Sequence, residues 1–414
     1  MKKLTIFAVM AAMATTAVAQ DDLVKQAKKL SDKGQMEEAV ALLKPALTSD
    51  QTLDKAKAWN VMSEIQHKIF MVGQQIEAEN KVKQTQTPYD TTAMYNAFLA
   101  SLEAAMKCDE YDRQPDEKGK VKLAYRKQNQ DKFFTQRLIA LQAGQHEYQK
   151  KNNEGAMKAW GLYVDSNSDP LFTGIDMTSD NYLIDFAYNT GLLAYTLKNY
   201  ELAKKYAAIA ANDAEKAKEA NELVIFSMRD GAKTAADSAA YVNKIKELHK
   251  QNPNEDRYFN LLQDYYVKSG NMEALGKWAE EEIAMNAQNK MAWALKGEVL
   301  MNTQKWDEAV AAYVKSAEID PTFVQVIFNA GVCLNSKAIE MKDQLADKKT
   351  GNLTTANFNK IKEVLMEAKV HLEKARELDP TQEKVKWAYP LYQIYYTVGD
   401  KAKSAEMEAL LGNK

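Results

Sequence analysis

Apolar residues recur at helical spacing along most of the chain, and this pattern predicts antiparallel helix pairs joined by short turns. The pattern is clearest between Pro253 and Pro321, where it repeats with the period of about 34 residues that is typical of helix-turn-helix units. One copy has the spacing W-x3-G-x2-L-x5-W-x2-A-x3-Y-x7-P, carried by Trp293, Gly297, Leu300, Trp306, Ala309, Tyr313 and Pro321. The copy before it again has large apolar residues or glycine, namely Phe259, Leu262, Tyr266, Gly270 and Met272.

Helix packing explains why these residue types recur. A small residue on the first helix, such as Gly297, and an alanine on the second, such as Ala309, allow the two backbones to approach. We expect Trp306 and Tyr313 to be buried around this contact. Each pair hides only part of its apolar face, so further pairs must stack on it. The stretch resembles a tetratricopeptide repeat (TPR), and the resemblance implies an all-α fold, a TPR-like α-solenoid of helical hairpins.

Weaker copies of the signature predict about seven or eight helix pairs in the mature chain. They are marked by Gly34, Met36, Ala39, Leu43 and Ala46, by Gly144, Ala156, Trp160, Tyr163 and Pro170, by Gly191, Tyr200 and Ala203, and by Leu391, Tyr395 and Gly399. A helix around residues 220–228 is expected to be irregular. The predicted divisions are a signal peptide at 1–19, N-terminal repeats with a long hairpin at 20–120, degenerate repeats at 121–252, and C-terminal repeats with a long hairpin and a terminal cap at 253–414.

Two of the predicted pairs are longer than the repeat period allows. Compared with a repeat of about 34 residues, the second helix arrives about 22 residues late in one pair, at Ala97, Ser101 and Ala104, and about 25 residues late in the other, at Ala368, Leu372 and Ala375. Each insertion is shared between the two helices of its pair, so each helix gains about 11 residues. A helix returns to the same face after about 11 residues, so the register of the repeat is kept. We expect apolar stripes to pack inside these arms: Ile65, Ile69, Val72 and Ile76 against Tyr95, Phe98 and Leu102, and Ile339 and Leu345 against Phe358, Ile361 and Leu365. The arms are either docking elements or extensions that cover the adjacent repeat.

The composition agrees with helix throughout the chain and disfavours nucleic acid as a partner. Glycine and proline together contribute only 24 of the 414 residues, which leaves few backbone breaks. The 55 basic and 57 acidic residues are interleaved and give a net charge of −2, so no basic face is expected to hold nucleic acid. Cys108 and Cys333 lack CxxC or Cys/His spacing, so they indicate no zinc site, although one long-range disulfide stays open.

The first residues have the pattern of a secretory signal peptide. Lys2 and Lys3 form a basic start, residues 4–14 are apolar, and small residues at 17–19 suit cleavage before Gln20. No cysteine follows this segment to carry a lipid anchor, and no second long apolar run predicts a membrane span. We therefore expect an exported, periplasmic protein of a Gram-negative bacterium, with secretion or surface association as the alternative.

Motifs for catalysis or cofactor binding are missing from the sequence. His67, His146, His249 and His371 occur singly, and neither dinucleotide-binding nor P-loop glycine patterns are present. The acidic run Asp109, Glu110, Asp112, Asp116 and Glu117 could gather calcium, but its lack of the central glycine of a calcium loop favours a solvated linker. We expect no enzyme activity, no cofactor and no metal.

A binding surface remains as the candidate site. In arrays that resemble this one, ligands lie along the concave face formed by the first helices of the pairs. The matching positions that we take as candidate partner-binding residues are Arg257, Asn260, Asp264, Lys268, Glu298, Met301, Asn302, Phe328 and Asn335. Ala294 and Glu298 stand where the carboxylate clamp of some cytosolic relatives needs a basic residue and an asparagine, so a receptor for chaperone tails is disfavoured.

The sequence therefore predicts a noncatalytic scaffold or adaptor whose partner is a protein or peptide of the cell envelope. The alternative is a glycan- or nutrient-binding protein of the periplasm or cell surface, which the missing anchor cysteine and the regular repeats disfavour. An enzyme ranks third, because no motif supports it.

Overall fold

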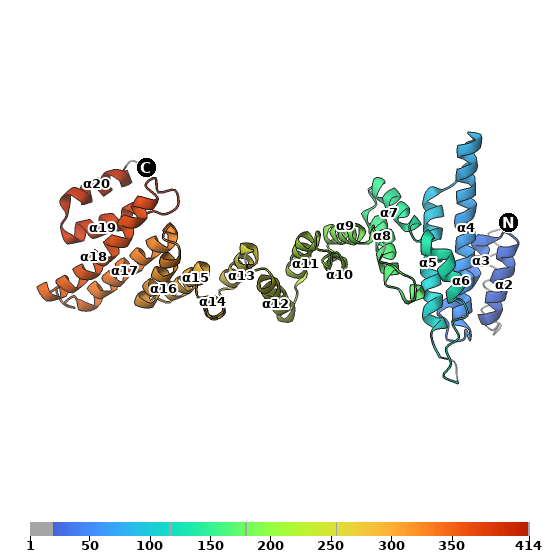
Figure 1. Cartoon of the computed structure of the whole chain (residues 1–414), viewed down its shortest axis with the longest axis horizontal. Coiled ribbons are helices and arrows are strands. Elements are labelled where there is room, and N and C mark those ends of the chain that lie inside the picture. The colour runs from blue at the N-terminus through green and yellow to red at the C-terminus, as the bar shows by residue number, and fades with distance from the viewer. Residues whose placement is uncertain (1–19, 116–117, 179, 254, 413–414) are drawn as a thin grey trace. The chain divides into compact units, whose positions relative to one another are not determined.

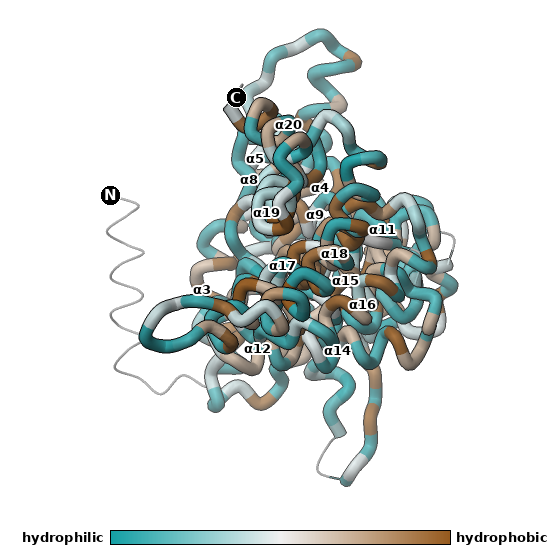
Figure 2. The backbone as a smooth tube through the Cα atoms, turned by 90° about the vertical axis from the view of Figure 1, so that its left-hand side faces the viewer, coloured by the Kyte–Doolittle hydropathy of each residue, from teal (hydrophilic) through white to brown (hydrophobic). Residues whose placement is uncertain are grey.

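The computed structural model describes residues 20–115, 118–178, 180–253 and 255–412 (Figure 1). Within these ranges the chain forms 19 α-helices and one short 3-10 helix, and it forms no β-strand. The predicted fold class, an all-α array of TPR-like helical hairpins, is confirmed. Hydrophobic and hydrophilic positions alternate in short steps along the helices (Figure 2), as amphipathic helices that bury one face require.

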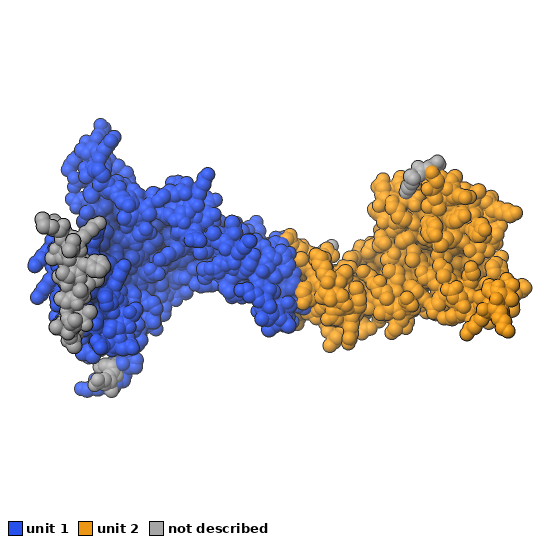
Figure 3. All heavy atoms as spheres, turned by 180° about the vertical axis from the view of Figure 1, so that it is seen from behind, with its two compact units in different colours: residues 1–244 blue, residues 245–414 orange. Residues whose placement is uncertain are grey.

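The chain divides after Lys244 into two compact units, which Figure 3 colours separately. In unit 1 most helices pair as successive hairpins, and α6 and the 3-10 helix η1 are inserted among them. Its helices are α2 (Gln20–Asp32), α3 (Met36–Thr48), α4 (Lys55–Lys83), α5 (Thr91–Asp112), α6 (Arg126–Gln136), α7 (Ile139–Gln149), α8 (Asn153–Asn167), η1 (Pro170–Phe172), α9 (Leu183–Thr196), α10 (Tyr200–Ala210) and α11 (Ala217–Gly231). The sequence-based boundaries at 120 and 252 stay predictions.

Helix α12 (Ala235–Gln251) crosses the division, and four hairpins follow it in unit 2. Their helices are α13 (Asp256–Lys268), α14 (Met272–Met285), α15 (Lys290–Asn302), α16 (Trp306–Ile319), α17 (Val324–Leu345), α18 (Thr355–Leu378), α19 (Ala388–Val398) and α20 (Lys401–Gly412). The first helices α13, α15 and α17 begin at residues 256, 290 and 324, and the second helices α14 and α16 begin at 272 and 306. The period of the sequence pattern is thus the period of the helix boundaries.

Close contact between paired helices depends on glycine, as the spacing predicts. A Cβ atom placed on Gly297 of α15 would lie 2.6 Å from Cδ1 of Tyr313 on α16. Gly144 of α7 has the same relation to Trp160 of α8, at 2.2 Å from Cδ1. In both hairpins the glycine and the aromatic residue have the same separation along the sequence, so the same interhelical contact is built twice.

The buried cores follow the hairpins, with one correction to the expected residues. Tyr313 is buried as predicted, in a core that extends to Trp387 and Leu391 of the last hairpin. Trp306, by contrast, is only half-buried, and its Nε1 donates to Glu340 Oε2 at 2.6 Å. It occupies the first position of α16, where part of the ring stays in contact with solvent. Trp278 of α14 is the fully buried tryptophan of this repeat region.

Both long hairpins are present, but the packing inside them differs in detail from the predicted stripes. Helices α4 and α5 have 29 and 22 residues, and α17 and α18 have 22 and 24, so each is longer than its counterparts in the regular hairpins. Val72 and Ile339 are exposed, so their assignment to the inner stripes is wrong. At these two positions the neighbouring residue faces inward: Gly73 lies against Met94 in the first arm, and Ala338 is buried in the second.

Two further predictions concern helix α11 and the terminal helix pair. The helix expected to be irregular near residue 220 is the regular 15-residue helix α11, so that expectation is wrong. The terminal pair α19 and α20 is present, and Gly399 ends α19 in the left-handed conformation at φ 84°. Met407 is the buried anchor of α20, while Leu410 and Leu411 are exposed.

Candidate functional site

The candidate residues of α13 lie on one exposed helix face. Arg257, Asn260, Asp264 and Lys268 follow one another at intervals of three or four positions, and all four are exposed. Lys268 Nζ lies 2.7 Å from Asp264 Oδ2, so these two charges compensate each other along the helix. This part of the predicted surface is a solvent-accessible polar face.

The candidates of α15 and α17 are more deeply placed. Glu298 accepts a hydrogen bond from Gln263 Nε2 of α13 at 3.3 Å, which links two first helices. Phe328 packs on the unit 2 core, as does Met301, whose sulfur lies 3.9 Å from the Tyr313 hydroxyl. Asn302 is exposed. The surface therefore becomes less charged and more apolar from α13 towards α17.

Asn335 is the candidate residue whose side-chain amide makes a hydrogen bond inside the fold. Its side chain is buried, and Nδ2 donates to Gln393 Oε1 of α19 at 3.1 Å. This contact joins the first helices α17 and α19. We therefore assign Asn335 a structural role beside the candidate surface, whose function as a binding site stays a prediction.

The structure adds a tyrosine face on α19 that the sequence reasoning missed. Tyr389 is 56% exposed and Tyr396 is 71% exposed, with half-buried Tyr392 between them. The helix carries no acidic or basic residue. The signal was visible as tyrosines at i, i+3 and i+7, but the repeat pattern indicates only a terminal helix pair here. Tyrosine on an uncharged, exposed helix face is typical of interaction surfaces.

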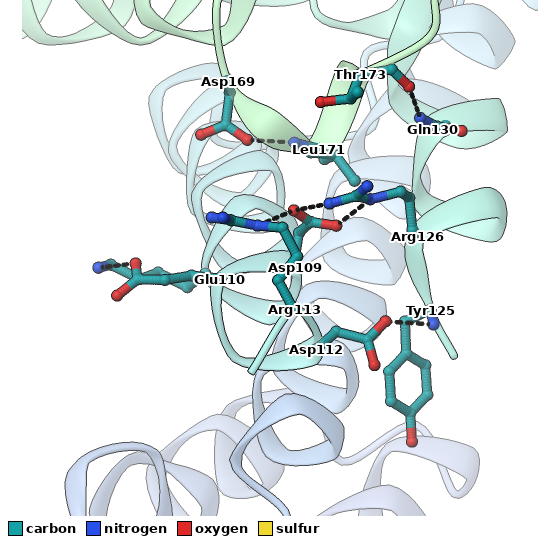
Figure 4. Close-up of polar contacts among 11 residues, drawn as sticks. Asp109, Glu110, Asp112, Arg113, Tyr125, Arg126, Gln130, Asp169, Leu171 and Thr173 are labelled. Atoms are coloured by element: carbon teal, nitrogen blue, oxygen red, sulfur yellow. Dashed lines mark hydrogen bonds and ion pairs between the residues drawn. The ribbon is translucent and has the colours of Figure 1, made fainter. Parts of the chain in front are cut away.

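Asp109 and Asp112 of the acidic run after Cys108 lie in α5 and are buried, so this part of the run is neither a solvated linker nor a calcium loop (Figure 4). The Asp109 side chain is only 1% exposed, and both of its oxygens accept hydrogen bonds from arginine. Arg126 donates from Nε at 2.7 Å and from Nη2 at 2.9 Å, and Arg113 donates from Nε at 2.9 Å. Two guanidinium groups thus bind both carboxylate oxygens, which a metal cation would need as ligands. Asp116 and Glu117 lie outside the described residues.

The same polar cluster joins three elements of unit 1. Asp112 Oδ2 accepts a hydrogen bond from the backbone nitrogen of Tyr125 at 2.8 Å, just before α6. Gln130 Nε2 of α6 donates to the carbonyl of Thr173 at 3.0 Å, after η1. Burial raises the pKa of Asp169, whose Oδ1 accepts from the Leu171 nitrogen at 2.8 Å. These contacts fix α5, α6 and η1 to one another, which is a structural task.

The first arm is partly covered by the neighbouring hairpin. Thr92 Oγ1 of α5 lies 3.0 Å from His146 Nε2 of α7, and Lys150 Nζ donates to Thr92 Oγ1 at 2.7 Å. The rings of Tyr95 and His146 are 5.5 Å apart. On the α5 side, therefore, the arm extends the contact with the adjacent repeat. This agrees with the interpretation of the arm as an extension that covers its neighbour.

Both cysteines are buried, and His249 contacts a carboxylate inside unit 2. Cys108 and Cys333 are free, buried thiols, and burial raises both pKa values, that of Cys333 to about 12. Such thiols stay protonated and are poor nucleophiles. His249 Nε2 lies 3.0 Å from Glu282 Oε2 in the interior of unit 2. Among the described residues no group of three or more His, Cys, Asp or Glu side chains is placed to hold a metal ion.

Comparison with known proteins adds a likeness of fold. No protein-family model and no curated protein matches the chain. A TPR repeats protein of Bacteroides fragilis is 14% identical, with 66% of this chain and 98% of that one covered at a TM-score of 0.35. The C-terminal part of a TPR repeat-containing protein from Cytophaga hutchinsonii is 14% identical, with coverages of 64% and 91% and a TM-score of 0.37. The human IFIT1 dimer with m7Gppp-AAAA is 17% identical, with coverages of 86% and 74% and a TM-score of 0.34.

A separate observation concerns membranes: none of the described helices is both long and apolar enough to cross a bilayer.

Proposed function

We propose that the chain is a noncatalytic scaffold or adaptor, exported to the bacterial periplasm, that binds another protein of the cell envelope. The observation that supports this function most is the exposed face of the first helices in unit 2. It carries paired charges on α13 and an uncharged tyrosine face on α19. A partner that lies along this face would contact the charged groups of α13 at one end and the tyrosines of α19 at the other.

The chemistry of this face suits protein recognition. Tyrosine supplies a large contact area with little loss of side-chain entropy, and it is enriched among the residues that dominate binding energy. The aromatic ring of Phe328 and the thioether of Met301 offer adaptable apolar contacts between the two ends. The periplasmic location rests on the signal-peptide pattern of residues 1–19, which lie outside the described residues.

Capture of the partner tests the proposal. The mature chain, residues 20–414, would be immobilised and exposed to a detergent-solubilised envelope fraction, with Tyr389→Ala/Tyr396→Ala as the binding variant. Tyr182→Ala, a similarly exposed tyrosine of unit 1, is the matched control. A specific protein retained by the native chain and by the control, but not by the double variant, is the expected result. Equal retention by all three would contradict binding through α19.

The second candidate function is glycan binding, which the same tyrosine face favours. Aromatic rings on an uncharged surface can stack on sugar rings, and Tyr389 and Tyr396 of α19 are both exposed. A glycan array separates the two functions: saturable binding of an oligosaccharide that the double variant loses would favour the carbohydrate ligand over the protein partner.

A further inference from the structure

Helix α4 carries a row of exposed apolar and small side chains along its distal half. Met71 is 45% exposed, Val72 is 54% exposed and Val82 is 83% exposed, in a chain whose other large apolar residues are mostly buried. Gln75 and Ala78 lie between them and are also exposed. Met71, Gln75, Ala78 and Val82 are spaced by four, three and four positions, which is the spacing of the seam in a coiled coil.

The row is open because the preceding hairpin is shorter than α4. Helix α2 ends at Asp32, and Lys68 of α4 lies level with this end, since its Nζ is 3.0 Å from Asp32 Oδ1 and 3.3 Å from Ser31 Oγ. Beyond Lys68 the helix continues to Lys83, a stretch about 22 Å long at a rise of about 1.5 Å per residue. On its other side the same stretch is occupied, because Gly73 lies against Met94 of α5.

An open notch marks the place where the short hairpin ends. Its volume is about 610 Å³, and it is lined by Met36, Lys68, Met71, Val72, Gln74 and Gln75. Met36, the first residue of α3, and Ile69 of α4 both pack on the core formed by α2, α3 and α4. The notch is therefore the open end of an existing helix–helix seam, and the exposed row on α4 continues that seam.

The charges that flank the row are compensated within α4. Lys81 Nζ lies 2.9 Å from Glu77 Oε1, and Lys83 Nζ lies 2.9 Å from Glu79 Oε2, each pair one helical turn apart. Neither sign of charge is left in excess beside the row. A ligand is thus selected by the spacing of its apolar side chains and not by its net charge.

We propose that this α4 groove, formed by Met36, Met71, Val72, Gln75, Ala78 and Val82, binds an amphipathic helix of a partner protein. The partner helix would take the place that a longer α2–α3 hairpin would fill, with its apolar side chains in the notch and along the seam. A second copy of the chain is not the occupant. The groove measures about 22 Å by about 10 Å, so it offers far less than the roughly 800 Å² per partner of a stable dimer.

This site lies in unit 1, apart from the first-helix face of unit 2, and it does not rest on the proposed function. The test uses residues 20–414 with ¹³C-labelled methionine methyl groups. The probe is a synthetic helix of six turns with leucine at the a and d positions and balanced Glu and Lys elsewhere, kept below the concentration at which it self-associates. A peptide of the same composition without the 4-3 spacing is the control.

Binding of the probe should shift the methyl signals of Met36 and Met71 and leave that of Met366, on α18 of unit 2, unchanged. Met71→Glu/Val82→Glu should weaken binding at least tenfold in fluorescence anisotropy. Val370→Glu, at an exposed valine of α18, should leave binding unchanged. Circular dichroism of each variant checks that the helices are intact.

Three results would overturn the inference: no saturable binding of the probe, equal binding of the control peptide, or equal loss in the Val370→Glu variant. Dimerisation of the native chain that Met71→Glu/Val82→Glu abolishes would assign the groove to a second copy instead. If the probe fails while α19-dependent capture of an envelope protein persists, only the groove is lost and the scaffold function stands.

Discussion

The indole ring of Trp160 on α8 occupies the space that a side chain at Gly144 of α7 would need. A Cβ atom at position 144 would lie 2.2 Å from both Cδ1 and Nε1 of this ring, while Nε1 donates to the carbonyl of Leu141 at 3.2 Å. The hydrogen bond holds the indole in place, so it cannot easily move aside. Glycine at this position is therefore a requirement of helix packing and not of backbone conformation.

Replacement of this glycine should separate α7 from α8. Gly144→Ala is expected to lower the free energy of unfolding by about 1–3 kcal/mol, the usual cost of overpacking a core. Urea denaturation followed by far-ultraviolet circular dichroism measures the change. Gly412→Ala is the matched control, because a Cβ atom there meets nothing within 4 Å. Equal midpoints for the two variants would show that the indole yields at little cost.

Trp278 and Trp306 should differ in their contribution to stability. Trp278→Ala removes a fully buried ring and is expected to cost about 3–5 kcal/mol. Trp306→Ala removes a half-buried ring and should cost clearly less. Hydrogen exchange should place the damage from Trp278→Ala in unit 2, with the protection of α2 and α3 retained, since repeats interact mainly with their neighbours. A uniform loss of protection would mean that the chain unfolds as one cooperative block.

The arginines around Asp109 should also differ in importance. Arg126→Ala leaves a buried carboxylate without its bidentate partner, and breaking a buried pair in this way typically costs about 3–5 kcal/mol. Arg113→Ala is the comparison, because Arg113 is more exposed and donates one hydrogen bond, so a smaller loss is expected. Equal destabilisation by the two substitutions would show that the carboxylate needs both charges.

Mild acid should destabilise both units through histidine. Burial lowers the pKa of His67 in unit 1 and of His371 in unit 2 below the ordinary 6.5. Below pH 6.5 the unfolded chain takes up protons at these sites before the folded chain does, so stability falls as the pH drops from 6.5 towards the lowered values. His67→Gln should flatten this dependence for unit 1 only. Urea titrations at pH 7.5 and pH 5, with hydrogen exchange to separate the units, provide the measurement.

Period and residue size were enough to predict the helical hairpins. The signature from Trp293 to Tyr313 predicts a helix pair at this place, and α15 and α16 form it. The orientation of helices in the long arms was harder to predict. Val72 is apolar but exposed, and Gly73 beside it is buried, because Met94 of the opposing helix fills the space above the glycine. The sequence pattern of one helix does not show which side chain of the opposing helix will pack against it.

The candidate surface was predicted only in part for a related reason. The exposed face of α13 follows from helical spacing alone. The burial of Asn335 depends on Gln393, which lies far along the chain on α19, and this pairing leaves no local signal. The salt bridges of Asp109 likewise depend on Arg126, which lies beyond a loop, so the expectation of a solvated linker is wrong for Asp109.

The length of the first arm can be tested by removing only the part that the structure shows to project. Deletion of residues 74–94 would cut too far, because Met94 is buried and lies against Gly73, so core contacts would be lost. Because Gly73 faces Met94 in an antiparallel pair, Glu77 is level with Asp90, the residue that caps α5. Residues 78–88 therefore extend beyond the paired region.

Replacement of residues 78–88 by a Gly-Ser-Gly turn should leave the free energy of unfolding within about 1 kcal/mol of the native value, since exposed segments contribute little. Thermal and urea denaturation measure this, and the variant lacking residues 74–94 should be clearly less stable. The short variant also loses Val82 and Ala78 while keeping Met71 and Val72. Weaker but measurable binding of the leucine-seam peptide would then show that the notch beside Met36 holds one end of the ligand helix, whereas unchanged binding would confine the site to the notch.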